Sequence, residues 1–444
     1  MGSGLFMFFL RRYYIRKNNK PIVFIPGLFG SLGDAIIPGT GEFDFGLAEY
    51  AYRPIMDNFK YMGYEENKNL FVAYYDWTKP NLYSAKKYLI PVIKKAKEIT
   101  GARKVDIVCH SMGGIVARAY VQSNFYAYDV DKLVMLGTPN SGSVEAYYFW
   151  AGGHLPNENL RGNFFYRLIR ESFLWIFKII YKKRNDLELL RDLFPSIQEL
   201  LPTSDYGDYL FYQIKNKHKE FIPIRNMNIE NKFLNKLNRN QRIIYKRRIK
   251  LYEIAGVGVD TEKYICVQKH NKYRKLWSDG MPLYSVKTSA GDGTVTLYSA
   301  SSLYGIKKYI YSDHVDMLKD SKELLANILN RRILYKAKVA NCIQTKYFYS
   351  IVAKNVNNIT INKDNREKTI LEEAMNKDKE ISIKQIGQND YWIIINLAFK
   401  KNINLSFIPM IGKESDIVIF FSNRNGEIKK IKEFTTSNIY SVNL

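Results

Sequence analysis

Cysteine is scarce in this sequence: Cys109, Cys266 and Cys342 are the only three in 444 residues. They are far apart and odd in number, so they indicate neither a disulfide framework nor a zinc site. Cys109 ends an apolar run and is expected to be buried.

Long apolar runs are absent as well, and no stretch is long enough to span a bilayer. Residues 5–10 are apolar, but Arg11 and Arg12 follow them, which reverses the order of a secretory signal, so no intact signal peptide is visible. Three interpretations of the tail formed by residues 1–19 stay open: a membrane-touching segment, a packed strand, or a segment foreign to the protein. The location of the protein is open too, and we expect it at a membrane surface or secreted.

Acidic residues are few. Asp and Glu number 43 against 67 Lys and Arg, which gives a formal net charge of +24. This excess favours contact with an anionic surface, either phospholipid or nucleic acid, although a solvated lysine-rich surface explains it equally well. No zinc finger or RNA-recognition signature is visible, so an anionic membrane surface ranks first and nucleic acid is the weakest partner. The oligomeric state is open.

The length of the chain predicts two domains. Apolar strands expected at 22–25, 69–75, 105–109, 132–136 and 251–257 alternate with helical patterns, among them 83–100 and 321–330. Such alternation is typical of a parallel α/β sheet. We expect this domain to cover residues 20–335.

A stretch of more than a hundred residues separates the fourth and fifth of these strands. Its pattern is helical and aromatic, notably at 164–166, 173–177 and 179–181, and Lys182-Lys183-Arg184 follows at once. An insertion of this length lies above the strand ends, where ligands bind. We interpret residues 144–250 as a helical cap, whose aromatic face either rests on lipid or packs within its own domain.

The pattern changes beyond residue 340. Short β-rich runs at 381–386, 391–398, 403–409 and 416–421 predict a small β-rich C-terminal domain over residues 340–444. It contains no recognisable catalytic constellation.

The first indication of a catalytic site is at residues 109–114 (Cys-His-Ser-Met-Gly-Gly), at the end of an apolar strand. A serine on a tight strand-to-helix turn holds its hydroxyl above the sheet, and small neighbours permit the turn. We therefore predict Ser111 to be a nucleophile. The usual pattern is Gly-x-Ser-x-Gly, and Cys109 departs from it.

A nucleophilic serine needs a base and an orienting carboxylate, which follow it in the order acid, then histidine, in this kind of fold. Asp292 lies between glycines at 290–295 (Ala-Gly-Asp-Gly-Thr-Val), and His314 is the histidine that follows it. The other histidines adjoin the serine, lie in the cap or precede the acid: His110, His154, His218 and His270. Asp313 and Asp316 are rival acids that lie too close to His314 in sequence.

The oxyanion of a tetrahedral intermediate needs two preorganised donors. One is the backbone N–H of Met112, directly after the nucleophile. The other is expected from residues 26–31 (Pro-Gly-Leu-Phe-Gly-Ser), where Leu28 would donate its N–H. Gly27 and Gly30 allow the backbone to approach a substrate closely.

Taken together, these stretches resemble the lecithin:cholesterol acyltransferase family, which includes lysosomal phospholipase A2 and phospholipid:diacylglycerol acyltransferases, and neighbouring bacterial lipases. Residues 75–77 (Tyr-Asp-Trp), 137–143 (Gly-Thr-Pro-Asn-Ser-Gly-Ser) and 313–318 (Asp-His-Val-Asp-Met-Leu) add to the resemblance. It covers roughly residues 20–335. Thr78 stands where an Arg is common, and no closely spaced cysteine pair could form a lid disulfide.

The resemblance implies an α/β-hydrolase fold, a triad of Ser111, Asp292 and His314, an oxyanion hole from Leu28 and Met112, and no metal or organic cofactor. The substrate is expected to be a lipid ester, cleaved or transferred by a lipase- or phospholipase-type hydrolase or O-acyltransferase. Substrate contacts are expected from a wider set: Gly27, Phe29, Trp77, Phe173 and Trp175. The alternatives are a carboxylesterase or thioesterase with a soluble substrate, and a catalytically silent lipid-binding module.

Overall fold

The computed structural model describes residues 20–33, 43–45, 48–153, 187, 191–192, 194–214, 218–268, 276–334, 347–363, 366–369, 381–397, 403–423 and 428–444. The chain divides into two compact units. The first comprises Met1–Gly30, Tyr52–Asn159 and Asn185–Lys336, and the second comprises Ser31–Ala51, Leu160–Arg184 and Ala337–Leu444. The predicted tail of residues 1–19 lies outside the described residues.

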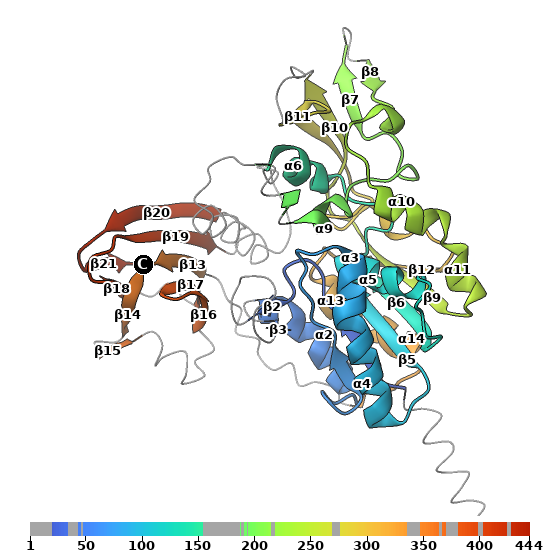
Figure 1. Ribbon diagram of the computed structural model, residues 1–444, viewed down its shortest axis with the longest axis horizontal. Coiled ribbons are helices and arrows are strands. Elements are labelled where there is room, and N and C mark those ends of the chain that lie inside the picture. Colours follow the sequence, from blue (N-terminus) through green and yellow to red (C-terminus); the bar gives the residue numbers. More distant parts are fainter. Residues whose placement is uncertain are drawn as a thin grey trace, which may run out of the picture. The chain divides into compact units, whose positions relative to one another are not determined.

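A six-stranded sheet forms the centre of the first unit, and β5, β6, β9 and β12 of this sheet are labelled in Figure 1. The order of its strands is β12-β9-β6-β5-β1-β4. Its strands are β1 (Ile22–Ile25), β4 (Leu70–Val72), β5 (Val105–His110), β6 (Val130–Leu136), β9 (Lys250–Val257) and β12 (Ile306–Tyr311). Every neighbouring pair is parallel. All residues of β1 and β5 are buried, which explains why these strands read as continuous apolar runs.

The order of the strands reverses at β1, which lies between β4 and β5. In open parallel sheets, ligands bind beyond the carboxyl ends of the strands at such a reversal. The loop that starts at Pro26 follows β1, and Ser111 follows β5. Two predicted parts of the site therefore leave the sheet at its reversal point.

Helices α4 and α5 pack on this sheet and contact β1 and β5. Among the described residues, the helices of the first unit outside the insertion are α2 (Glu49–Tyr61, whose first residues belong to the second unit), α3 (Asn81–Ser84), the π-helix η2 (Ala85–Leu89), α4 (Ile90–Thr100), α5 (Met112–Val121), α12 (Leu297–Ala300), α13 (Met317–Asp320) and α14 (Lys322–Leu329). The helix predicted over 83–100 is confirmed, although it begins at Asn81 and contains a π-turn. Gly101, at a φ of 65°, ends it in the left-handed conformation that glycine favours.

The described part of the insertion contains helices, as expected, and also strands that the sequence pattern did not predict. Its helices are α6 (Glu145–Gly152), α9 (Pro195–Gln198), the 3-10 helix η4 (Ile224–Asn226), α10 (Lys232–Arg239) and α11 (Arg242–Lys246). Strands β7 (Leu210–Gln213) and β8 (Lys219–Phe221) join β10 (Thr261–Gln268) and β11 (Met281–Thr288) in a second sheet, in the order β11-β10-β7-β8. β7 pairs with the adjacent β8 and also with β10, which lies far along the chain, so local periodicity does not reveal the second pairing.

The second unit contains a two-stranded sheet, β2 (Leu32–Gly33) with β3 (Phe43–Asp44), and two larger antiparallel sheets. One larger sheet has the order β16-β17-β13-β19-β20 and the other β15-β14-β18-β21. Their strands are β13 (Tyr347–Lys354), β14 (Val356–Lys363), β15 (Arg366–Thr369), β16 (Ile381–Gly387), β17 (Asp390–Leu397), β18 (Asn404–Pro409), β19 (Ser415–Asn423), β20 (Ile428–Thr436) and β21 (Tyr440–Asn443).

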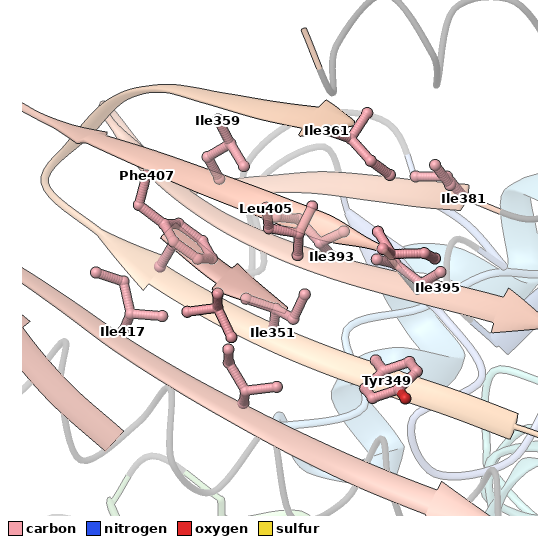
Figure 2. Close-up of a cluster of buried hydrophobic side chains, with 14 of the residues drawn as sticks. Tyr349, Ile351, Ile359, Ile361, Ile381, Ile393, Ile395, Leu405, Phe407 and Ile417 are labelled. Atoms are coloured by element: carbon pink, nitrogen blue, oxygen red, sulfur yellow. The ribbon is translucent and has the colours of Figure 1, made fainter. Parts of the chain in front are cut away.

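Both larger sheets contribute alternate residues to one apolar core, shown in Figure 2. Ile351 on β13, Ile393 and Ile395 on β17, and Leu405 and Phe407 on β18 are all fully buried there. Side chains two positions apart share a face of a strand, and this periodicity is what the sequence displays. The predicted α/β fold with a following β-rich region is confirmed.

Among the described residues, no helix has the length and apolar character needed to cross a membrane.

Candidate active site

Ser111 occupies the turn between β5 and α5 with a φ of 53° and a ψ of −128°, a conformation that L-residues rarely adopt. The helix that follows passes close to other backbone. A Cβ at Gly113 would lie 2.5 Å from the carbonyl oxygen of Pro26, and one at Gly114 would lie 2.0 Å from the Thr138 hydroxyl oxygen. These contacts explain why small residues follow the serine, and the turn places Ser111 just beyond the carboxyl end of β5.

Cys109 is buried, as predicted, and lies within β5, so its backbone is that of an extended strand. Its Sγ lies 3.3 Å from the carbonyl oxygen of Val134 on the neighbouring strand. The turn therefore begins after this residue, and a side chain is accommodated where other sequences have glycine.

His314 lies between Ser111 and Asp292. Its Nε2 is 2.9 Å from the Oγ of Ser111, and its Nδ1 is 2.8 Å from Oδ2 of Asp292. The other carboxylate oxygen, Oδ1, accepts the backbone N–H groups of Thr294 and Val295 at 2.9 and 2.7 Å. Both carboxylate oxygens are thus used, and the orientation of the acid toward the ring is determined.

The electrostatics of His314 follow from this pairing. Burial acts to lower the pKa of the imidazole, but the charge and the hydrogen bond of Asp292 outweigh it, so the pKa is raised above its usual value. The carboxylate therefore favours the protonated ring, which is the form a base takes after it accepts a proton.

Glycines pack tightly around the acid and the base. A Cβ at Gly256 would lie 2.6 Å from the Cβ of Asp292. Gly137 has a φ of 56°, and a Cβ there would lie 3.1 Å from both Oδ2 of Asp292 and Nδ1 of His314. The Asp292–His314 pair is therefore held by close backbone contacts as well as by hydrogen bonds.

The predicted oxyanion loop packs directly on Ser111, because a Cβ at Gly27 would lie 2.7 Å from the Cβ of Ser111. Leu28 follows in the same loop, which is closed by the Gly30 N–H donating to the Gly27 carbonyl at 3.0 Å. Met112 is the first residue of α5. The first amides of a helix have no intrahelical acceptor, so the Met112 N–H is available to an anion beside Ser111.

The profile of the lecithin:cholesterol acyltransferase family matches residues 42–275, which is more than half of the chain. This protein belongs to the lecithin:cholesterol acyltransferase family. The matched range includes Ser111 and ends before Asp292 and His314, so the association of those two residues with the serine rests on the geometry above. Membership supports an ester hydrolase or acyltransferase activity.

No curated protein matches the chain significantly. Among solved structures, the mature form of the Bacillus licheniformis lipase BlEst2 is similar at 16% identity, over 70% of this chain and 92% of that one, with a TM-score of 0.36. A Listeria innocua gene product is 12% identical over 72% and 96%, with a TM-score of 0.33. A hydrolase of 2-hydroxy-6-oxo-6-phenylhexa-2,4-dienoate from Rhodococcus is 13% identical over 70% and 90%, with a TM-score of 0.34. Such distant similarities assign no substrate to this lecithin:cholesterol acyltransferase family member. The fold is that of the α/β-hydrolases, as predicted.

In this family member, residues 137–143 form hydrogen bonds both with α5 and with the region around Asp292. The side-chain amide of Asn140 donates to the carbonyl of Ala300 at 3.1 Å, and the Ser143 hydroxyl donates to the carbonyl of Thr294 at 2.8 Å. Arg118, buried on α5, donates to the carbonyl of Asn140 at 3.2 Å. The stretch therefore contributes to the position of the acid rather than to the reacting atoms.

Phe29 and Trp77, predicted substrate contacts, pack on each other with ring centroids 4.7 Å apart. Phe194, from the insertion, stacks on Trp77 with a centroid distance of 5.6 Å and an interplanar angle of 10°. All three side chains are buried, and a role in substrate binding stays a prediction. Phe173 and Trp175 lie outside the described residues.

The departure at Thr78 has a local explanation. Its backbone N–H and hydroxyl both donate to Oδ1 of Asp76, at 3.1 and 2.6 Å, and the side chain is buried. A small hydroxyl residue therefore closes the turn in place of the long arginine side chain common in the family.

The rival acids and histidines are placed elsewhere. Oδ1 of Asp313 accepts the backbone N–H groups of Val315 and Asp316 at 2.9 and 2.7 Å. Burial raises the pKa of Asp316 to about 6. The carbonyl of His218 accepts the N–H of Ile214 beside the β7–β8 hairpin, while His154 and His270 lie outside the described residues.

Sequence reasoning missed Tyr52, a buried residue of α2 whose hydroxyl accepts the N–H of Gly27 at 2.8 Å. It also lies 3.1 Å from Nδ1 of His110. One tyrosine among 34 carries no signal in the sequence. Within the part of the chain that the structure describes, no three His, Cys, Asp or Glu residues are grouped so as to hold a metal ion.

Proposed function

We propose that this protein is a serine-dependent acyl hydrolase or O-acyltransferase that acts on lipid esters, of the lipase or phospholipase type. The observation that carries the proposal is the hydrogen-bonded series Ser111–His314–Asp292 at the carboxyl end of a parallel sheet. Membership of the lecithin:cholesterol acyltransferase family supports the same chemistry.

In the first half of the reaction, Oγ of Ser111 attacks the ester carbonyl carbon while Nε2 of His314 takes the hydroxyl proton. Asp292 stabilises the resulting imidazolium. The carbonyl oxygen becomes an oxyanion that the N–H groups of Leu28 and Met112 stabilise. His314 then gives its proton to the leaving alcohol, the carbon–oxygen bond to that alcohol breaks, and an acyl-serine remains.

In the second half, His314 takes a proton from the acceptor, whose oxygen attacks the acyl-serine. Collapse of the second tetrahedral intermediate returns the proton to Oγ of Ser111. Water as the acceptor releases a carboxylic acid, and an alcohol as the acceptor yields a new ester. The same residues serve both outcomes, so the acceptor decides between hydrolase and transferase.

A lipid substrate is supported by the family and by the net charge of +24, which favours an anionic phospholipid surface. Within this proposal, residues 20–335 form the catalytic domain, residues 144–250 its cap, and residues 340–444 a separate β-rich domain.

The test compares acyl release from anionic phospholipid vesicles and from a monomeric short-chain ester, for the unaltered protein and for Ser111→Ala. We expect release to favour vesicles and to fall at least about a thousandfold in the variant, because the nucleophile is lost. The matched control is Ser123→Ala, which removes a serine hydroxyl bonded to the Tyr120 carbonyl just beyond α5. It should retain full activity.

Each outcome is informative. Activity on the monomeric ester alone would replace the lipid substrate with a soluble one, and activity that survives Ser111→Ala would overturn the serine mechanism. Adding a long-chain alcohol to the vesicles then separates transfer from hydrolysis, since only a transferase forms the new ester.

A further inference from the structure

A chain of hydrogen bonds joins the oxyanion loop to the backbone of the base. The N–H of Gly27 lies 2.8 Å from the hydroxyl of Tyr52, and that hydroxyl lies 3.1 Å from Nδ1 of His110. Nε2 of His110 lies 2.8 Å from the carbonyl oxygen of His314. All four residues are buried, and the three bonds connect the loop after β1, helix α2, the end of β5 and the loop after β12.

The direction of each bond follows from chemistry. A carbonyl oxygen only accepts, so Nε2 of His110 carries a proton. Burial and the neighbouring His314 hold the pKa of His110 well below its usual value, so the ring is neutral and Nδ1 is an acceptor. The Tyr52 hydroxyl therefore donates to Nδ1 and accepts from Gly27. All three hydrogen bonds therefore donate in the same direction along the chain of bonds, from Gly27 toward His314.

The packing around this chain is close. The rings of His110 and His314 have centroids 4.8 Å apart, and a Cβ at Gly27 would lie 3.2 Å from Nδ1 of His110. A shift of the oxyanion loop would therefore strain its bond to Tyr52, and a shift of Tyr52 would strain the bond to His110.

We propose that Tyr52 and His110 are positioning residues that hold the oxyanion loop and the base of this site in register with each other. The inference rests on the proposed function, since it assigns both residues to the proposed reaction. Neither reacts with substrate. Tyr52 orients the Pro26–Gly27 peptide, which directly precedes the peptide that carries the Leu28 N–H. His110 orients the peptide that carries the carbonyl of His314.

A misplaced donor or base costs rate more than binding, because the oxyanion and the imidazolium exist only during the reaction. We therefore expect Tyr52→Phe to lower kcat on a monomeric ester by about tenfold to a hundredfold, with KM changed by less than about threefold. The rate of Ser111 labelling by a fluorophosphonate should fall in parallel, since this reaction uses the same donors and base.

The matched control is Tyr64→Phe. Tyr64 is also buried beside α2, and its hydroxyl accepts from Nε of Arg331 at 3.1 Å, outside the site. It should keep full kcat. A glutamine can supply both an N–H and an acceptor oxygen, so His110→Gln should retain more kcat than His110→Leu. The double variant Tyr52→Phe/His110→Leu should be no slower than the slower single variant, because one chain is broken in each.

Unchanged kcat in a folded Tyr52→Phe protein, or independent losses that multiply in the double variant, would overturn the inference. If Tyr52→Phe does not fold, the comparison of His110→Gln with His110→Leu decides, and equal loss in both counts against positioning. Ser111→Ala is measured alongside. Activity without Ser111 would reject the proposed function itself, whereas an inactive Ser111→Ala with a fully active Tyr52→Phe rejects only the inference.

Discussion

At the scale of single residues, the decisive feature is the pairing of His314 with Asp292. The base must be neutral to accept the serine proton, and its pKa is raised by the carboxylate. Activity should therefore rise with pH through a pKa above the usual value for histidine, about 6.5. The same pairing stabilises the fold below about pH 6.5, and that contribution is lost as pH rises through the folded pKa.

Asp292→Asn tests this directly. Without the carboxylate, burial is the largest remaining influence on His314 and lowers its pKa, so the acid limb of kcat/KM against pH should move to lower pH. The plateau rate should fall by about a thousandfold or more, since the imidazolium loses its partner. Asp313→Asn is the control, because Asp313 bonds to backbone N–H groups and its charge is a minor influence on His314. A larger effect from Asp313 would contradict the assignment of the acid.

The sequence was sufficient to nominate Ser111, Asp292 and His314. Small residues at turns are local signals, and the order of serine, acid and histidine can be read along the chain. Gly113 and Gly114 indicate the serine turn, because a larger residue at either position would clash with neighbouring atoms. Tyr52 and Arg118 give no such signal. Their importance comes from partners that are distant in the chain, and nothing adjacent to them distinguishes them from other tyrosines and arginines.

At the scale of elements, strands buried on both faces were recognisable and an exposed edge strand was not. β5 is fully buried and reads as an apolar run, whereas β12 contains Lys307 and Lys308 and is mostly exposed. Strands β7 and β8 were missed inside the insertion; they pair with each other, but the strand that joins them to the rest of their sheet, β10, comes from outside it. Local patterns report burial, and they do not report which strand lies alongside.

One contact between the insertion and the rest of the first unit gives a prediction about stability. Oε2 of Glu199, just after α9, accepts the backbone and side-chain N–H groups of Asn81 at 2.7 and 2.6 Å. Burial raises the pKa of Glu199 to about 7, and these hydrogen bonds oppose the rise. The stability that the protonated form contributes is complete below about pH 4.5 and is lost as pH rises through about 7.

Glu199→Gln keeps an acceptor oxygen and removes the buried charge. The free energy of unfolding at pH 8 should rise by roughly 2 kcal/mol, and at pH 4.5 it should change little. Urea unfolding at the two pH values measures this. Glu98→Gln, at an exposed position of α4, should show no such pH-dependent difference. A destabilised Glu199→Gln protein at pH 8 would show that the carboxylate is favourable.

At the scale of the whole molecule, the β-rich region has an apolar core built from its own strands. If residues 340–444 form the separate domain we propose, calorimetry should resolve two unfolding transitions. Ile393→Ala removes a fully buried side chain from that core and should destabilise one transition by about 3 kcal/mol, leaving esterase activity intact. Ile115→Ala, in the nucleophile helix, should lower the other transition. A single transition lowered by both variants would contradict the division.

The bond between His314 and Ser111 joins positions 203 residues apart. During synthesis, at roughly 5–20 residues per second, the serine leaves the ribosome roughly 10 to 40 s before the histidine. The nascent chain therefore carries a nucleophile without its base throughout that interval. In the reaction proposed above, cleavage needs both residues, so a translation product that ends before His314 should be inactive.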